Sequence, residues 1–268
     1  MPVDHTDTYT TPPGSARGWA ARFPSLIFPW KVFCIIKRDG GLSNAGKYCS
    51  DAWRQGSEDT LRALEACGVR LHVEGLRHID EVDGPCVFIG NHMSTLETFV
   101  LPMFIQPRKE VTFVVKSSLL GYPWFGPVLR SRDPIVVGRS NARQDLTTVL
   151  EGGTERLQQG RSIIVFPQST RSAEFDPAQF NSIGVKLAKR AGVPVIPLAL
   201  RSDAWGSGKI IKDFGKINPA LPAHFAFGKA MSITGNGKAE HAAICEFIQT
   251  RLEGWTKPAL APGEAVNG

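Results

Sequence analysis

Short apolar runs alternate along the chain with longer segments in which apolar residues recur at helical spacing. The runs predict strands at 69–73, 86–89, 111–115, 134–137, 162–166, 193–200 and 224–227. The longer segments predict helices at 43–67, 141–159, 181–191 and 240–252. Strands and helices that alternate at these lengths predict an α/β fold, with a mostly parallel sheet flanked by helices.

Glycine and proline modify three of these elements. Gly56-Ser57 is expected to divide the segment 43–67 into two helical pieces, and Gly152-Gly153 is a candidate break in the second predicted helix. Pro194 and Pro197 lack the N–H group that a sheet ladder needs. Their strand is therefore expected near an edge of the sheet.

The two ends of the chain have a composition of their own. Residues 1–16 are rich in threonine and proline, and the residues from Lys257 onward are rich in proline, alanine and glycine. Such stretches bury too little apolar surface to fold, so 1–16 and 257–268 are predicted to be disordered tails. The rest divides into an N-terminal helical segment, 17–69, and one domain, 70–256.

The N-terminal helical segment contains an apolar and aromatic run at 23–36, which two prolines and Lys31 interrupt. A spanning helix needs about 20 apolar residues, so this run is not expected to cross a bilayer, and no small-residue cleavage site follows it as in a signal peptide. Basic residues surround it: Arg17, Arg22, Lys31, Lys37, Arg38 and Lys47. Apolar bulk with a basic fringe is typical of a membrane-interface segment; a core helix with solvated lysines is the alternative.

Composition narrows the class of protein further. The 42% apolar and 21% charged residues are ordinary for a globular chain, and the formal net charge of +6 predicts an anionic partner. Membrane lipid, a phosphorylated substrate, an acidic carrier protein and nucleic acid all fit, but no nucleic-acid-binding motif is present. The five cysteines have neither C-x-x-C nor metal-ligand spacing, which indicates reduced thiols and a cytosolic compartment.

The candidate chemistry is concentrated at 90–98, Gly-Asn-His-Met-Ser-Thr-Leu-Glu-Thr, directly after the predicted strand at 86–89. His92 and Glu97 are five positions apart, which in a regular helix would turn them about 140° from each other. At a turn from strand to helix the two side chains can converge. A carboxylate bonded to one ring nitrogen leaves the other as a base; the alternative is a surface histidine at a helix start.

Two further polar segments follow predicted strands. In the first, Lys116 precedes a short glycine-containing turn with the pair Trp124-Phe125, interpreted as core packing, and Arg139 ends the next apolar run. A cation at a strand end suits a phosphate; a surface cation is the alternative. The second segment, Phe166 to Ser172, reads Phe-Pro-Gln-Ser-Thr-Arg-Ser after a buried strand, where ligands of parallel α/β folds gather.

These segments together resemble the glycerolipid acyltransferases, the lysophosphatidate (1-acyl-sn-glycerol-3-phosphate) acyltransferase family. Asn91-His92-x4-Glu97 is similar to that family's Asn-His-x4-Asp, and 166–172 is similar to its Phe-Pro-Glu-Gly-Thr-Arg-Ser. The segment from Lys116 and the run Val193-Pro194-Val195-Ile196-Pro197 resemble its other two motifs, in the family's order. The departures are glutamate for aspartate at 97, glutamine for glutamate at 168, and Ser169 for glycine.

The resemblance implies an O-acyltransferase that moves a fatty acyl group from acyl-ACP or acyl-CoA to a hydroxyl of a lysophospholipid, with 1-acylglycerol-3-phosphate giving phosphatidate. It implies a catalytic pair in which His92 is the general base and Glu97 orients it. The residues implied to bind substrate are Asn91, Lys116, Arg139, Gln168, Ser169, Thr170 and Arg171. The cations among them are implied to hold the acceptor's phosphate, and backbone N–H groups near 168–170 to face the oxyanion.

The same resemblance implies the partners and the location. No acyl-enzyme is implied, because Gly-x-Ser-x-Gly is absent, and no metal or bound cofactor is expected beside the acyl donor as co-substrate. The partners are the lysophospholipid, the donor and a membrane surface, with a monotopic or peripheral location at the cytoplasmic face. A non-catalytic phospholipid-binding protein, an acyltransferase with a different glycerolipid acceptor, and a thioesterase are the alternatives.

Overall fold

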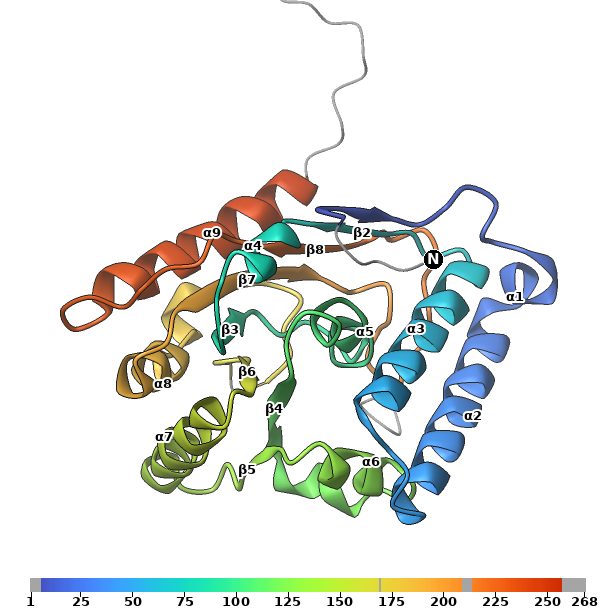
Figure 1. Ribbon diagram of the computed structural model, residues 1–268. Helices are drawn as coiled ribbons and strands as arrows, with labels where there is room; N and C mark the ends of the chain where they lie inside the picture. The colour runs from blue at the N-terminus through green and yellow to red at the C-terminus, as the bar shows by residue number, and fades with distance from the viewer. Residues whose placement is uncertain (1–5, 169, 209–213, 257–268) are drawn as a thin grey trace, which may run out of the picture.

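The computed structural model describes residues 6–168, 170–208 and 214–256, which are built on an eight-stranded sheet (Figure 1). The strand order is β1-β2-β8-β7-β3-β6-β4-β5. The strands are β1 (Tyr9–Thr10), β2 (Leu71–Glu74), β3 (Val87–Gly90), β4 (Val111–Lys116), β5 (Ile135–Val137), β6 (Ser162–Val165), β7 (Val195–Arg201) and β8 (Ala223–Phe227). Neighbouring strands pair in parallel, except β1 with β2 and β7 with β8. The predicted α/β fold with a mostly parallel sheet is confirmed.

Helices cover both faces of the sheet (Figure 1). One face carries α7 (Ala142–Gln158), α8 (Ile183–Ala191) and α9 (Lys238–Thr256). The other carries α1 (Gly18–Arg22), α2 (Pro24–Asn44), α3 (Ser50–Ala66), α5 (Leu96–Ile105) and α6 (Phe125–Ser131). The short elements are α4 (Arg77–Asp80), η1 (Ser117–Gly121) and η2 (Pro177–Gln179).

The apolar run of each central strand contributes side chains to two cores, one on each face of the sheet. Successive side chains of a strand point to opposite faces. In β3, Phe88 therefore packs into the core with α2, α3 and α5, whereas Val87 and Ile89 pack into the core with α7, α8 and α9. Burial on both faces explains why these strands are largely continuous apolar runs rather than alternating ones.

β7 is a central strand, so the prediction that it lies near an edge is wrong. It pairs with β3 on one side and with β8 on the other. The ladder with β8 covers Leu198 to Arg201, and just before it the N–H of Gly228 donates to the carbonyl of Pro197. Both backbone groups of one strand residue face the same neighbour. The N–H that Pro197 lacks would therefore face β8 just outside this ladder, and the pairing of Leu198 to Arg201 with β8 does not need it.

Two glycine-containing positions predicted as helix breaks lie inside continuous helices. The break between α2 and α3 falls at 45–49, and Gly56-Ser57 is within α3. A Cβ on Gly56 would collide with the carboxylate of Asp39 in α2. Likewise α7 continues through Gly152-Gly153, where a Cβ at the second glycine would lie 2.6 Å from Leu187 in α8. These glycines permit close helix crossings. In the sequence, a glycine at a helix crossing cannot be told from a glycine that ends a helix.

The start of the described chain is ordered, which corrects the predicted tail from residue 6 onward. β1 pairs antiparallel with β2, and the hydroxyl of Tyr9 donates to Glu65 in α3 at 2.6 Å. A two-residue strand is too short to show any periodicity, so the sequence pattern could not reveal this pairing. Residues 1–5 and the predicted tail 257–268 lie outside the described residues.

α2 has one buried and one exposed apolar face. Phe28 and Val32 are fully buried, and the ring of Phe28 meets Trp205 edge-on with centroids 4.7 Å apart. On the outside are large apolar side chains that we name the exposed stripe: Trp19 in α1, Phe23 between the two helices, and Leu26, Trp30 and Phe33 in α2. Within the described ranges, no helix combines the length and the apolar character that crossing a membrane requires.

Gly40 and Gly41 provide a matched test of how α2 docks on the domain. A Cβ on Gly40 would lie 2.6 Å from Trp124, whereas a Cβ on Gly41 would meet nothing within 4 Å. We expect Gly40→Ala to lower the free energy of unfolding by about 1–3 kcal/mol through overpacking. We expect Gly41→Ala to raise it by up to about 1 kcal/mol, because alanine favours the helix. Urea unfolding followed by circular dichroism measures both, and equal effects would contradict this contact.

Candidate functional site

Four neighbouring parallel strands, β3, β6, β4 and β5, end at the same edge of the sheet, and predicted site residues follow each of them. His92 comes after β3, Gln168 after β6, Lys116 at the end of β4 and Arg139 after β5. The pairing of Lys116 with Val137 brings the last two ends together. Ligands of open α/β sheets bind at the carboxyl ends of parallel strands, so the fold gathers the predicted residues where binding is expected.

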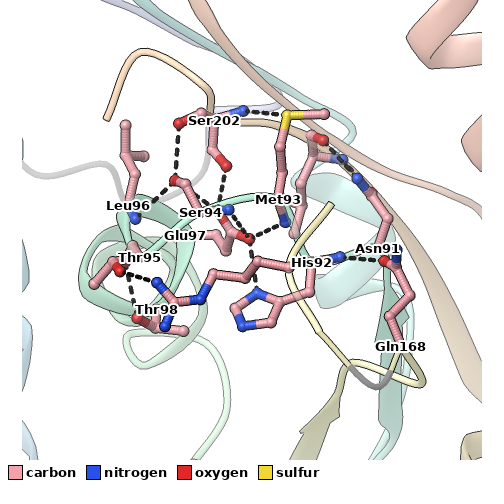
Figure 2. Close-up of polar contacts among 12 residues, drawn as sticks. Asn91, His92, Met93, Ser94, Thr95, Leu96, Glu97, Thr98, Gln168 and Ser202 are labelled. Atoms are coloured by element: carbon pink, nitrogen blue, oxygen red, sulfur yellow. Dashed lines mark hydrogen bonds and ion pairs between the residues drawn. The ribbon is translucent and has the colours of Figure 1, made fainter. Parts of the chain in front are cut away.

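His92 and Glu97 converge where β3 gives way to α5, as their spacing predicts. Nδ1 of His92 lies 2.9 Å from Oε1 of Glu97 (Figure 2). The side chain of Glu97 is fully buried, whereas that of His92 is 15% exposed. Because the carboxylate accepts a hydrogen bond from Nδ1–H, Nε2 of the neutral ring carries a lone pair and can act as a base.

The carboxylate of Glu97 accepts further hydrogen bonds from neutral donors (Figure 2). Oε1 accepts from the N–H groups of Met93 at 2.7 Å and Ser94 at 3.0 Å. Oε2 accepts from the same N–H of Ser94 at 3.1 Å and from the hydroxyl of Ser202. Burial raises the pKa of Glu97, but the hydrogen bond and charge interaction with His92, together with the hydrogen bonds from Ser202 and Ser94, outweigh it and the net shift is downward. Glu97 is therefore ionised beside the imidazole.

The segment after β6 holds His92 from its other side. Oε1 of Gln168 accepts from the N–H of His92 at 2.6 Å, and the N–H of Ser172 donates to the carbonyl of His92 at 3.0 Å. The ring of Phe166 stacks on the imidazole, with centroids 4.6 Å apart and planes within 3°. The contact with Gln168 needs only an acceptor oxygen, which the amide supplies as well as a carboxylate would. The two segments thus form one unit around the histidine.

Asn91 has a place in the fold that differs from the predicted substrate contact. Its side chain is 2% exposed. Its Nδ2 donates to the carbonyl of Leu200 and its Oδ1 accepts from the N–H of Leu200, both at 2.8 Å. The amide therefore extends the pairing of β3 with β7 beyond the end of β3. We assign Asn91 to the framework of the site rather than to its substrate contacts.

The three predicted cations lie at the carboxyl ends of different strands. Nη1 of Arg171 donates to Oγ1 of Thr95 at 2.6 Å, in the turn that contains the His92–Glu97 pair. Lys116 and Arg139 are exposed at the ends of β4 and β5. Arg139 has a φ of 61°, and its N–H donates to Asp145 at 2.8 Å. Of the three, Arg171 is thus tied to the turn of the pair.

The remaining predicted residues are less defined. Thr170 is exposed, and Ser169 lies outside the described residues. In the part of the chain that the structure describes, no group of three or more histidine, cysteine, aspartate or glutamate side chains is arranged to hold a metal ion. The arrangement offers a carboxylate-paired base with cations along the same edge. Such a site can remove a proton from a hydroxyl of an anionic molecule.

Sequence reasoning missed the contributions of Ser202, Phe166 and Thr95 to the site. Ser202 directly follows the buried strand β7. A polar residue after a buried strand is the signal that identified His92 and Gln168, so it was available for Ser202 too. The stacking of Phe166 depends on the relative height of two strands, which side-chain periodicity does not encode.

Comparisons with known proteins single out one family. The family profile described as Acyltransferase matches residues 70–201. The 1-acyl-sn-glycerol-3-phosphate acyltransferase of Pseudomonas aeruginosa is 34% identical over 195 residues, which cover 72% of this chain and 70% of that protein. A chloroplastic 1-acyl-sn-glycerol-3-phosphate acyltransferase of Brassica napus is 29% identical over 142 residues, which are 53% of this chain and only 39% of that protein.

A solved structure shares the fold. The crystal structure of the 1-acyl-sn-glycerophosphate (LPA) acyltransferase from Thermotoga maritima superposes with a TM-score of 0.64, covering 90% of this chain and 100% of that chain. The two sequences are 18% identical. At that level the likeness concerns the architecture, and it agrees with the sheet described above.

Replacement of Asn91 separates a framework role from a substrate contact. We expect Asn91→Ala to lower the free energy of unfolding by about 2–4 kcal/mol, because it leaves both backbone groups of Leu200 buried without partners. Asn91→Asp should also destabilise the protein, since a carboxylate cannot donate to the carbonyl. Urea unfolding measures both variants. A stable Asn91→Ala protein that binds a lysophospholipid more weakly would instead support the predicted substrate contact of Asn91.

Proposed function

The chain belongs to the family of 1-acyl-sn-glycerol-3-phosphate acyltransferases, which are O-acyltransferases, and from this membership we propose that it acylates 1-acylglycerol-3-phosphate to give phosphatidate. The donor in this proposal is an acyl thioester, acyl-ACP or acyl-CoA. The observation that carries the proposal is the pair of His92 with the buried Glu97 at the carboxyl edge of the sheet, with Arg171 tied to the same turn.

In the proposed reaction His92 is the general base. Nε2 takes the proton of the acceptor hydroxyl while the hydroxyl oxygen attacks the carbonyl carbon of the thioester. A C–O bond forms and the carbonyl oxygen becomes an oxyanion, for which we propose backbone N–H groups near 168–170 as donors. The oxyanion then collapses, the C–S bond breaks, and the leaving thiolate takes the proton from the imidazolium. Glu97 keeps Nδ1 protonated and stabilises the positive ring.

The chemistry of the acceptor indicates which of the three cations binds its phosphate. In 1-acylglycerol-3-phosphate the reacting hydroxyl and the phosphate are on adjacent carbons, so the phosphate must bind close to His92. Arg171 meets this condition, because it is bonded to Thr95 in the same turn. We propose Arg171 as the principal phosphate ligand, since guanidinium forks onto two phosphate oxygens. Lys116 and Arg139 add positive charge at the ends of β4 and β5, where other parts of the substrates would bind.

Replacement of His92 tests the proposed reaction. We expect His92→Ala to lower kcat by roughly 10²–10⁴-fold, the usual contribution of a positioned base, with an unchanged circular dichroism spectrum. His78→Ala is the matched control: Nδ1 of His78, in α4, lies 2.9 Å from Glu81, the residue after that helix, in another histidine–glutamate pair. It should retain full turnover. Phosphatidate formed from 1-acylglycerol-3-phosphate and an acyl thioester is measured by mass spectrometry.

The other functions give different results in the same assay. Turnover of His92→Ala at the rate of the wild type would contradict the proposed base. Thioester cleavage that continues without an acceptor would indicate a thioesterase. Product formed only with another lysolipid would change the acceptor. Binding of lysolipid without formation of any product would indicate a non-catalytic phospholipid-binding protein.

We further propose that the exposed stripe lies in the membrane interface at the cytoplasmic face. Trp124, which is 42% exposed, extends the stripe, because its ring meets Phe33 edge-on with centroids 5.7 Å apart. Tyr122, two residues before it, is 38% exposed. Trp124 is therefore not core packing, although Phe125 stacks on Phe99 as expected of a core residue. Exposed tryptophan and tyrosine rings are typical of the boundary between headgroups and acyl chains.

Charged substitutions test the membrane contact without unfolding the domain. Deletion of the segment would expose the core around Phe28, so we use Leu26→Glu with Trp30→Glu instead. This variant should bind anionic lipid vesicles at least about tenfold more weakly, because interfacial binding depends on buried apolar area. Gln249→Glu with Thr250→Glu adds the same charge to exposed positions of α9 and should bind normally. Unchanged co-sedimentation of the α2 variant would contradict the proposal.

A further inference from the structure

Ser202 is a buried hydroxyl at the site that no motif of the sequence includes. It is fully buried and directly follows β7. Its Oγ donates to Oε2 of Glu97, as Figure 2 shows. The two residues are 105 positions apart in the chain, so this contact joins the turn after β3 to the end of β7.

We propose that Ser202 is a positioning residue for the acyl transfer, acting through Glu97 on His92. The inference rests on the proposed function and adds a residue to it. The hydroxyl of Ser202 holds Oε2 so that Oε1 points at Nδ1 of His92. It also supplies part of the hydrogen bonding that keeps a fully buried carboxylate ionised.

The division of contacts between the two carboxylate oxygens supports this role. Oε1 accepts from Nδ1–H of His92 and from the N–H of Met93, whereas Oε2 accepts from the hydroxyl of Ser202. The N–H of Ser94 lies between the two oxygens, at 3.0 Å from Oε1 and 3.1 Å from Oε2. The donors from Met93 and Ser94 belong to the same turn as Glu97 and move with it. Among the described residues, Ser202 is the donor to this carboxylate that comes from outside the turn. It therefore determines where the carboxylate lies relative to the sheet.

The backbone of Ser202 is held independently of its side chain. Its carbonyl accepts from the hydroxyl of Ser94 at 2.8 Å and from the N–H of Trp205 at 3.2 Å. Its N–H points to the sulfur of Met93 at 3.3 Å. Loss of the hydroxyl alone leaves these contacts in place, so Ser202→Ala removes a donor to Glu97 without removing the anchor of the loop.

The proton balance of the pair predicts the direction of a pH effect. The active form pairs neutral His92 with ionised Glu97, and the hydroxyl of Ser202 stabilises that negative charge. Without the hydroxyl the pair takes up a proton more readily, so the acid limb of the pH dependence of kcat/KM moves to higher pH. The neighbouring charges stay in place: Arg171 is bonded to Thr95, and Arg201 and Asp203 pair with each other at 3.6 Å.

Two substitutions and one control distinguish hydrogen bonding from packing. We expect Ser202→Ala to lower kcat roughly tenfold, as loss of a hydrogen bond to a charged group would, with little change in the KM for the lysophospholipid. Ser202→Cys fills the same space with a weak donor and should remain impaired. Ser162→Ala is the control: Ser162 is also fully buried, bonds the N–H of Cys86 at 3.1 Å, and lies outside the site. It should lower stability but keep full kcat.

The background of Glu97→Gln shows whether Ser202 acts through the carboxylate. If it does, Glu97→Gln with Ser202→Ala should be no slower than Glu97→Gln alone, because the charge that the hydroxyl serves is already gone. Full kcat in Ser202→Ala, rescue by Ser202→Cys, an unmoved acid limb, or additive losses in the double variant would each overturn the inference. Failure of the proposed function looks different: the wild type would form no phosphatidate, or His92→Ala would be fully active.

Discussion

A carboxylate with no contact to solvent has to receive hydrogen bonds from the protein, and at Glu97 this requirement determines the structure of the site. An ionised group in the interior is tolerated when donors replace the water it has lost. The turn after β3 supplies N–H groups from Met93 and Ser94, the end of β7 supplies the hydroxyl of Ser202, and His92 supplies its Nδ1–H. The imidazole is thus one of the donors that the buried charge needs, and this bond through Nδ1 leaves Nε2 available as a base.

The position of His92 depends equally on the segment after β6. Gln168 accepts from its N–H, Ser172 donates to its carbonyl, and Phe166 covers one face of its ring. β3 lies between β6 and β7 in the sheet, so the histidine is held from both neighbouring strands. These contacts restrict the motion of the imidazole, and in the proposed reaction a base that is already oriented loses little entropy. This explains how segments far apart in sequence act as one site.

Much of this was accessible from the sequence, because period and turn chemistry act locally. The apolar runs predicted seven strands of the sheet, and five-residue spacing at a strand end predicted that His92 and Glu97 would meet. What the sequence did not reveal depends on packing between distant segments. Pro197 indicated an edge strand, yet it lies at the end of a ladder in a central strand. Gly56 indicated a helix break, yet it permits a helix crossing. Asn91 belonged to a motif that implied a substrate contact, yet its amide is hydrogen-bonded to the backbone of Leu200 in the neighbouring strand β7.

The most direct test of the account is the tautomer of His92, observed by ¹⁵N NMR of protein labelled at its six histidines, with His92→Gln to assign the resonances. The account predicts that, where the ring is neutral, Nδ1 carries the proton and Nε2 is bare, and that Glu97→Gln weakens this preference because an amide oxygen is a poorer acceptor than a carboxylate. A neutral ring protonated at Nε2, or a tautomer that does not respond to Glu97→Gln, would contradict the claim that the buried carboxylate makes His92 a base.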